Sequence, residues 1–239
     1  MRLSAINLVK RYSRKIVVNS LSIDVSSSEV VGLLGPNGSG KSTTFNMIMG
    51  FTKPDDGKIL LDNKDITNIP VHIRARLGLG YLAQEPTVFR DLTVEENVLV
   101  VLEGIFSNKD EIKQRLDRIL KEYSVEHLRK QKASTLSGGE KRRVEVARVM
   151  ALEPSILLLD EPFVGIDPIT VCELKKIIEY LSKKNIAILI SDHNVRETLE
   201  ITTRAYLVYQ GEIIVHGSPK DIINSEKARR FYLGYDFKV

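Results

Sequence analysis

A glycine-rich segment between two apolar runs constrains the fold of this chain more than any other feature. Residues 35–43 read GPNGSGKST, follow the apolar run VVGLL at 30–34 and precede FNMIM at 45–49. Strand, glycine-rich loop and helix occur here in the order that a nucleotide phosphate site requires. Glycines let backbone N–H groups converge on phosphate oxygens, and a helix N-terminus adds partial positive charge there. Because both the full pattern and its context are present, we expect a nucleotide site rather than a turn that binds nothing.

The loop supplies most of the expected nucleotide contacts. Lys41 can reach the β- and γ-phosphates, and the Ser42 hydroxyl can ligate magnesium. The loop residues predicted to bind ATP are Gly35, Pro36, Asn37, Gly38, Ser39, Gly40, Lys41, Ser42 and Thr43.

Two carboxylates follow a second buried strand. Residues 156–159 are ILLL, and Asp160 and Glu161 come next. The carboxyl ends of parallel strands are where such sheets present ligand-binding groups. We expect Asp160 to hold magnesium through its water shell, and Glu161, which points elsewhere because strand side chains alternate, to polarise the attacking water. Two solvated acids at a strand end are the ordinary alternative, but the glycine-rich loop favours the catalytic interpretation.

Three further positions complete the set. Ser137, Gly138, Gly139 and Glu140 precede a helix, so this turn is either a second anion site or a plain N-cap. One chain does not need two γ-phosphate sites, so we expect the turn to serve the nucleotide of a second copy. His193 and Gln84 each follow a predicted strand, at 186–190 and 78–82, from which they can reach the γ-phosphate, the water or magnesium.

Hydrophobic periodicity divides the chain into three stretches. Strands are expected at 1–12, 16–18, 21–25, 30–34, 58–61 and 78–82. Residues 85–153 are helical, with helix caps at Thr93 and Asn108 and a helix over 137–152. Strands at 156–159 and 186–190, helices at 171–181 and 194–201, and a hairpin over 206–215 follow, before short helices after Pro219 and Glu226. Strongly apolar strands that alternate with helices predict a mostly parallel sheet covered on both faces.

Composition excludes several classes of protein. Lys plus Arg is 35 and Asp plus Glu is 31, and the resulting charge of +4 is spread along the chain, which does not favour nucleic-acid binding. No segment approaches the ~18 to 20 apolar residues of a membrane span, and the N-terminus lacks the apolar run of a secretory signal. The single cysteine, Cys172, has no partner for an internal disulfide and is expected to be a small buried residue. We therefore expect a cytoplasmic chain.

This ordered set of motifs resembles the nucleotide-binding subunit of ATP-binding-cassette (ABC) transporters over essentially the whole chain. The resemblance makes residues 35–43 the Walker A loop, Gln84 the Q-loop residue, 136–140 the signature, 156–160 Walker B, 165–167 the D-loop and His193 the switch histidine. It also makes Glu161 the catalytic glutamate and Tyr12 the aromatic that stacks on adenine. Glu140 departs from the generic signature, which has glutamine.

The resemblance implies a P-loop NTPase fold in one domain, 1–239. Residues 1–84 and 154–239 form a RecA-like core with an N-terminal antiparallel β-subdomain and a C-terminal tail, and 85–153 form a helical subdomain that carries the signature. The implied cofactors are ATP and Mg²⁺, with Glu161, His193 and Gln84 catalytic. The metal ligands would be Ser42, Gln84 and Asp160.

The resemblance also implies partners. A head-to-tail homodimer holds two ATP molecules, with Ser137, Gly138, Gly139 and Glu140 acting on the partner's nucleotide. Integral membrane permease subunits dock a cytoplasmic helix near Phe89 and Arg90, although a core aromatic is an equal interpretation of Phe89. No nucleic acid is expected, and contact with the inner membrane is expected only through these partners, on its cytoplasmic face.

A narrower resemblance is to ATPases of the lipopolysaccharide export system of Gram-negative bacteria. It rests on residues 84–85, 88–90, 126–129, 160–163 and 192–199 and on the tail at 232–234 with Asp236 and Phe237, while Tyr235 departs from it. ATPases of branched-chain amino-acid importers are the alternative. Soluble ABC proteins that act on DNA or ribosomes usually carry two cassettes or a long coiled-coil insertion, which this chain lacks. Glu161 and His193 argue against a binder that does not hydrolyse ATP.

Overall fold

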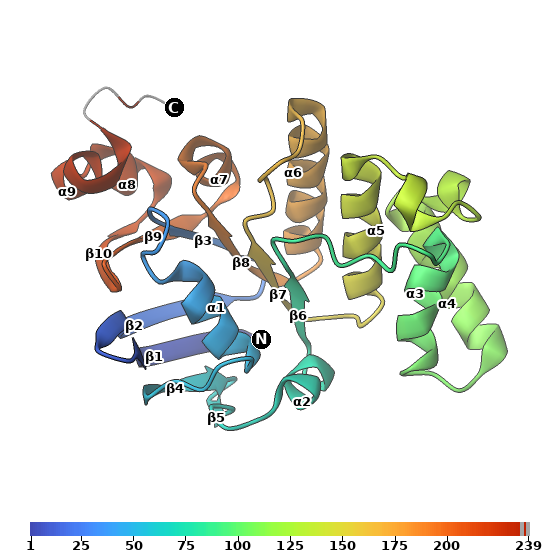
Figure 1. Ribbon diagram of the computed structural model, residues 1–239, viewed down its shortest axis with the longest axis horizontal. Helices are drawn as coiled ribbons and strands as arrows, with labels where there is room; N and C mark the ends of the chain where they lie inside the picture. The colour runs from blue at the N-terminus through green and yellow to red at the C-terminus, as the bar shows by residue number, and fades with distance from the viewer. Residues whose placement is uncertain (235–236, 238–239) are drawn as a thin grey trace.

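Two β-sheets and a group of helices build the molecule (Figure 1). The computed structural model describes residues 1–234 and Phe237. The tail positions Tyr235 and Asp236 lie outside the described residues. Among those described, no helix combines the length and hydrophobicity that crossing a bilayer needs.

The core sheet has the strand order β10-β9-β3-β8-β7-β6. Strands β3 (Val30–Leu34), β6 (Leu79–Leu82), β7 (Ile156–Asp160), β8 (Ala187–Asp192) and β9 (Arg204–Tyr209) run parallel, and β10 (Glu212–Gly217) pairs antiparallel with β9. Every residue of β3, β7 and β8 is buried, as expected for strands covered on both faces. The mostly parallel sheet predicted from the apolar runs is confirmed.

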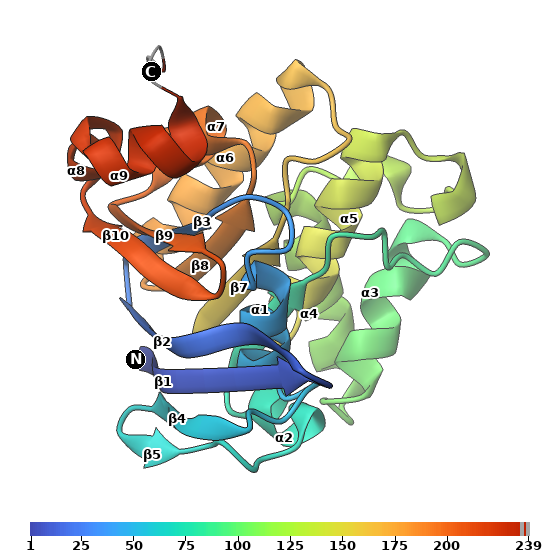
Figure 2. The same cartoon turned by 60° about the vertical axis from the view of Figure 1, so that its left-hand side comes forward.

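The N-terminal sheet is antiparallel, in the order β2-β1-β4-β5. It consists of β1 (Arg2–Tyr12), β2 (Lys15–Ser26), β4 (Asp56–Leu61) and β5 (Lys64–Asp65). The two short strands expected at 16–18 and 21–25 are one continuous strand, because β2 follows β1 through irregularities in register rather than breaking. Figure 2 shows this sheet lying below the core sheet, with α1 (Lys41–Met49) beside both. Phe45, Met47 and Ile48 of α1 are fully buried in a core that includes residues of both sheets.

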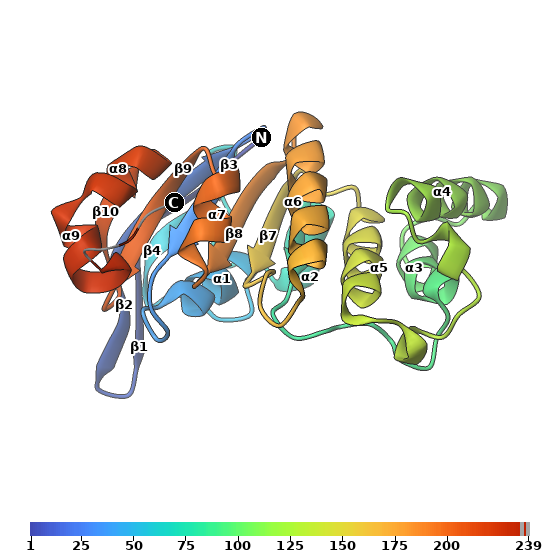
Figure 3. The same ribbon diagram turned by 90° about the horizontal axis from the view of Figure 1, so that it is seen from above.

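Helices cover the face of the core sheet that lies opposite α1 and the N-terminal sheet, and they extend to one end of the molecule (Figure 3). The helices α3 (Val94–Glu103), α4 (Lys109–Glu122) and α5 (Gly138–Met150) lie at that end, away from the N-terminal sheet. The helices α6 (Pro168–Lys183) and α7 (Val195–Ile201) lie over the core sheet. Predicted caps are confirmed: Thr93 forms a capping box, and the Asn108 side chain accepts from two amides of the first turn of α4.

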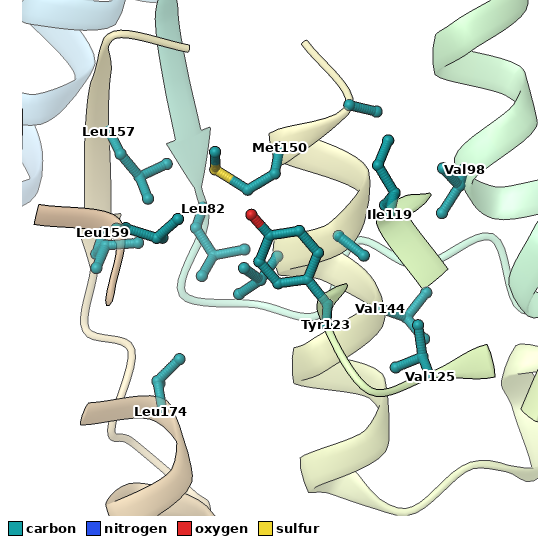
Figure 4. Close-up of a cluster of buried hydrophobic side chains, with 14 of the residues drawn as sticks. Leu82, Val98, Ile119, Tyr123, Val125, Val144, Met150, Leu157, Leu159 and Leu174 are labelled. Carbon is teal, nitrogen blue, oxygen red and sulfur yellow. The ribbon is translucent and has the colours of Figure 1, made fainter. Parts of the chain in front are cut away.

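A shared hydrophobic core joins the helical segment to the sheet. Figure 4 shows Tyr123 and Met150 on the side of Leu82, Leu157 and Leu159 of the strands, with Val144 and Val125 on the other side of Tyr123, and all belong to one cluster. The segment 85–153 therefore does not have a separate core, although its helices lie to one side.

The remaining elements are short. They are α2 (Val71–Arg76), α8 (Pro219–Asn224), α9 (Glu226–Ala228), the 3-10 turns η1 (Glu126–Leu128) and η2 (Ala133–Thr135), and the π-helical η3 (Arg229–Leu233). The expectation that Cys172 is buried is wrong, because it is exposed. The buried stripe of α6 runs through Val171, Leu174, Ile178 and Leu181, and position 172 lies one residue off that stripe.

Candidate active site

The glycine-rich loop links β3 to α1. The structure shows why glycine stands at positions 35 and 38 and which atoms Lys41 contacts. Gly35 has φ +150°, and a Cβ there would lie 2.2 Å from the carbonyl oxygen of Val208. Gly38 has φ +75° and open space around it, so a ligand can approach the backbone closely. Lys41 is buried, and its ammonium donates to the carbonyls of Gly35 at 2.7 Å and Pro36 at 3.2 Å. Burial lowers the pKa of Lys41, and Glu161, Asp160 and Asp192 oppose that shift.

A cavity of about 280 Å³, called here the phosphate cavity, opens in front of this loop. Its lining brings Gln84 and Glu161 to the loop across the edge of the sheet. The lining residues are Val17, Asn37, Gly38, Gly40, Lys41, Ser42, Thr43, Gln84 and Glu161. The glycine-rich loop follows β3, Gln84 follows β6 and Glu161 follows β7. The carboxyl ends of these three parallel strands lie at this edge of the sheet. Val17 was not expected from the sequence, and it comes from the N-terminal sheet.

The two carboxylates after β7 have different partners. Asp160 accepts from the Tyr81 hydroxyl at 3.1 Å and from the Ser191 hydroxyl at 2.5 Å. Burial and the nearby Asp160 charge raise the pKa of Tyr81, so Tyr81 keeps its proton and remains a donor. Asp160 is thereby held in one orientation by two neutral donors.

Glu161 occupies a strained backbone position at the edge of the phosphate cavity. Its φ is +44°, in the left-handed region that residues other than glycine adopt infrequently. Its amide donates to the Ser191 carbonyl at 2.8 Å, which fixes the turn. Its carboxylate accepts from the Gln84 amide at 3.0 Å, and the His193 Nδ1 lies 3.4 Å away. The three residues predicted to be catalytic therefore lie together.

The turn that carries His193 is held by buried polar contacts. The carboxylate of Asp192 is fully buried and accepts from the amides of Phe163 at 3.2 Å and Asn194 at 2.8 Å. Burial raises the pKa of Asp192, which these amides oppose. The Tyr232 hydroxyl of η3 donates to the His193 carbonyl at 3.0 Å. The His193 side chain itself is 47% exposed.

None of residues 136–140 lines the phosphate cavity of its own chain. Ser137 caps α5 by accepting from the Glu140 amide at 3.3 Å, and the Glu140 carboxylate accepts from the Ser137 amide at 2.8 Å. These bonds lower the pKa of Glu140. Glutamate and glutamine both close such a capping box, so Glu140 in place of the generic glutamine preserves the turn.

A second cavity, of about 250 Å³, brings three predicted motifs together. Gln84, Gly138 and the segment 164–166 all line it. Asp167 ends that segment and caps α6 by accepting from the amides of Ile169 and Thr170, each at 3.0 Å. The D-loop region is thus fixed directly to the first turn of α6.

Oxygen donors at the sheet edge suit a divalent cation. Ser42, Gln84 and Asp160 offer hydroxyl, amide and carboxylate oxygens, the hard ligands that Mg²⁺ prefers. In the part of the chain that the structure describes, no group of three or more His, Cys, Asp or Glu side chains forms a separate metal site. The residues present therefore fit a magnesium ion that a nucleotide also ligates.

The residue predicted to stack on adenine, Tyr12, and those predicted to contact a permease helix, Phe89 and Arg90, line neither of the two cavities. Tyr12, at the end of β1, is 49% exposed, and the Lys10 ammonium lies 5.6 Å from its ring centroid. Phe89 is 48% exposed, so its interpretation as a core aromatic is wrong. The Arg148 guanidinium lies 5.1 Å from the Phe89 ring, and Arg90 is exposed beside it.

Polar contacts between α5 and residues 83–87 were not expected. The buried Glu145 carboxylate accepts from the Thr87 amide and pairs with Arg142 at 3.0 Å. Arg142 also donates to the Ala83 carbonyl at 3.0 Å, and Arg148 donates to the Thr87 carbonyl at 2.7 Å. A stretch of mixed charge on one helix predicts a solvated face, so the sequence carried no signal for these buried bonds.

Comparison with known proteins identifies the family that this geometry represents. The profile described as ABC transporter matches residues 18–164, from β2 to the residue before the D-loop segment 165–167. The chain belongs to the ABC transporter family. It is an ABC transporter ATPase, the ATP-binding subunit of such a transporter.

Relatives match this ABC ATPase over its full length. It is 49% identical over 242 residues to the lipopolysaccharide export system ATP-binding protein LptB of Escherichia coli K12, covering 99% of each chain. The protein of the same name from Acidithiobacillus ferridurans is 49% identical over 237 residues, covering 99% of this chain and 98% of the relative. An ATP-binding cassette of an ABC transporter, solved in its ADP conformation, superposes with a TM-score of 0.88 at 29% identity, covering 98% of this chain and 99% of the other.

Proposed function

We propose that this chain hydrolyses ATP to drive the export of lipopolysaccharide from the inner membrane. The contact of Glu161 with Gln84 and His193 at the rim of the phosphate cavity carries the catalytic part of the proposal. The full-length identity to proteins named for lipopolysaccharide export supports the cargo. A branched-chain amino-acid importer has the same chemistry and remains the alternative cargo class.

Hydrolysis in this site depends on positioning and electrostatics. The loop amides and Lys41 bind the phosphates. Ser42, Asp160 and Gln84 are the residues that would hold Mg²⁺, which would supply positive charge to offset the negative charge of the phosphates. Glu161 orients the attacking water and accepts its proton, while His193 donates to the γ-phosphate. Tyr12 is proposed to stack on adenine.

The Lys41 ammonium must change partners when a nucleotide binds. It donates to two loop carbonyls, and a γ-phosphate offers it a full negative charge instead. We expect ATP to compete for these donors, so that binding reorganises the loop locally.

Two copies of the chain are proposed to form the complete site. Ser137, Gly138, Gly139 and Glu140 lie outside the phosphate cavity of their own chain, and the N-terminus of α5 presents free backbone amides. The same turn in a second copy can close over the γ-phosphate, and ATP binding then stabilises the closed homodimer.

The helical segment 85–153 is proposed to transmit this closure to integral membrane permease subunits. Exposed Phe89 and Arg90 follow Gln84 directly and offer an aromatic and a cationic contact for a cytoplasmic helix of the permease. Residues 1–84 and 154–239 then act as the nucleotide-binding core. We place the chain on the cytoplasmic face of the inner membrane, in contact with the bilayer only through these partners and with no role for nucleic acid.

Substitution of Glu161 tests the catalytic proposal. Glu161→Gln keeps the side-chain volume but removes the base, so we expect phosphate release to fall by at least ~10²-fold while ATP still binds. Gel filtration with ATP should then show a trapped dimer. Glu103→Gln, an exposed substitution at the end of α3, is the matched control. A Glu161→Gln variant that turns over at the control rate would refute the role.

Reconstitution tests the cargo. The chain is purified from its native membranes with the subunits that accompany it and is reconstituted in proteoliposomes. ATP-dependent release of lipopolysaccharide supports export. ATP-dependent uptake of leucine with no release of lipopolysaccharide supports the importer instead.

A further inference from the structure

Helix α5 rests on helix α6 through two contacts in register. A Cβ added to Gly139 would lie 2.5 Å from the Thr170 hydroxyl oxygen and 3.1 Å from its methyl carbon. Four residues later on α5, Arg143 donates to the Glu173 carboxylate, three residues later on α6. The N-terminal turns of the two helices therefore lie against each other, and the first contact leaves no room for a side chain.

The Thr170 side chain is held where it blocks that space. It is 9% exposed, and its hydroxyl donates to the second carboxylate oxygen of Asp167 at 2.6 Å. The other oxygen of Asp167 accepts from the Thr170 amide at 3.0 Å. Rotation of Thr170 about χ1 would move its hydroxyl away from Asp167 and break this bond.

The two adjacent glycines differ in their surroundings. Gly138 has no heavy atom within 4 Å of an added Cβ, whereas the nearest atoms at Gly139 all belong to Thr170. Neither glycine is among the residues with positive φ, so the backbone itself does not need glycine at either position. Of these two glycines, only Gly139 meets an atom of its own chain that would exclude a side chain.

We propose that Thr170 is a positioning residue that seats the signature turn on α6, and that Gly139 is glycine because of this contact within its own chain. The inference rests on the proposed role of the turn in the partner's site. Helix α6 starts directly after the segment 161–167, which begins at Glu161. The contact therefore connects the loop of the catalytic carboxylate in one site to the turn that completes the other site.

Four variants test the contact: Gly139→Ala, Thr170→Ala and the double variants Gly139→Ala/Thr170→Ala and Gly139→Ala/Thr170→Ser. We expect Gly139→Ala to lower phosphate release by ~10- to 100-fold, because overpacking displaces the turn. Fluorescent (mant) ATP should still bind within about twofold of wild type, because no residue of the turn lines the phosphate cavity of its own chain.

The double variants decide the cause. Of the three nearest atoms, alanine at 170 removes those at 2.5 and 3.1 Å and keeps the Cβ at 3.4 Å, an ordinary contact. We therefore expect Gly139→Ala/Thr170→Ala to recover the turnover and Tm of Thr170→Ala alone. Serine keeps the oxygen at 2.5 Å, so Gly139→Ala/Thr170→Ser should remain impaired.

Three results would overturn the inference. These are wild-type turnover in Gly139→Ala, no recovery in the alanine double variant, or equal recovery with serine. A lack of recovery would mean that the nucleotide or the partner, rather than Thr170, excludes a side chain at 139. If the wild-type chain hydrolyses no ATP, the proposed function fails instead, and the Tm values of the four variants still test the contact.

Discussion

Replacing Arg74 should destabilise the protein strongly, because its buried guanidinium joins three segments. Arg74 is 1% exposed and donates to the carbonyls of Met47 at 2.8 Å and Ile48 at 2.5 Å, at the C-terminal end of α1. It also donates to the carbonyls of Ile69 at 2.7 Å and Thr67 at 2.8 Å. The cation thus caps the helix that follows the phosphate loop, where its charge complements the helix dipole.

The size of the effect follows from what the substitution leaves behind. Arg74→Met keeps the apolar stem but removes a donor from four carbonyls, of which that of Met47 keeps a bond from the Gly50 amide at 3.1 Å. Each buried acceptor left unsatisfied costs ~1–3 kcal/mol. Burial lowers the pKa of Arg74, which shows that desolvation of the cation opposes its bonds and that its removal returns part of the loss. We expect a net loss of about 3–5 kcal/mol, similar to breaking a buried ion pair. For a chain of this length, that corresponds to a fall in Tm of about 10 °C.

Thermal and urea unfolding of Arg74→Met, Arg74→Lys and wild type measure this loss. Lysine keeps the charge but lacks the planar fork, so its stability should lie between the other two. Arg76→Met on the same helix is exposed and should stay within ~0.5 kcal/mol of wild type. A fall in Tm below 2 °C for Arg74→Met would show that the carbonyls find water or other donors, and would refute the reasoning.

Three other perturbations have defined outcomes. Lys41→Ala should weaken ATP binding at least ~10-fold by titration calorimetry, because it removes the phosphate-facing cation, and unchanged affinity would contradict the loop assignment. Tyr232→Phe should lose about 0.5–1.5 kcal/mol of stability by urea unfolding, because its hydroxyl bond to the His193 carbonyl disappears. The Thr170 hydroxyl and amide hold the pKa of Asp167 below its usual 3.8, so the stability that Asp167 contributes is present above that pH and is lost as pH falls through the folded-state pKa. Asp167→Asn should therefore flatten the dependence of Tm on pH below about 4, and an unchanged acid limb would contradict this.

Most of the architecture could be predicted because local patterns determine it. Apolar runs predict the buried strands β3, β7 and β8. The polar residues Thr93 and Asn108 predict the starts of α3 and α4. The grouping of Gln84, Glu161 and His193 followed from one rule, that the carboxyl ends of parallel strands meet at one edge.

The missed features depend on contacts between segments distant in sequence. Helix α2 is short and lacks apolar periodicity, and its buried Arg74 is specified by carbonyls from two other segments, 47–48 and 67–69. Cys172 was misplaced because its local sequence is apolar, although the buried stripe of α6 passes beside it. Gly139 was interpreted only as a phosphate contact, since no local pattern shows that Thr170 occupies the space of its side chain.

In the proposed dimer, helix α5 contacts residues of two different ATP sites, one for the nucleotide of its own chain and one for the nucleotide of the partner. Its N-terminal turn faces a partner's γ-phosphate in the proposed dimer, while Glu145 and Arg142 in its next turns bond Thr87 and the Ala83 carbonyl on either side of Gln84. Glu145 is 2% exposed and pairs with Arg142. Moving residues 83–87 away from α5 would remove the Thr87 amide from this buried carboxylate, which is unfavourable. We therefore expect a shift of Gln84 toward a bound nucleotide to be coupled to α5 through the bonds of Glu145 and Arg142.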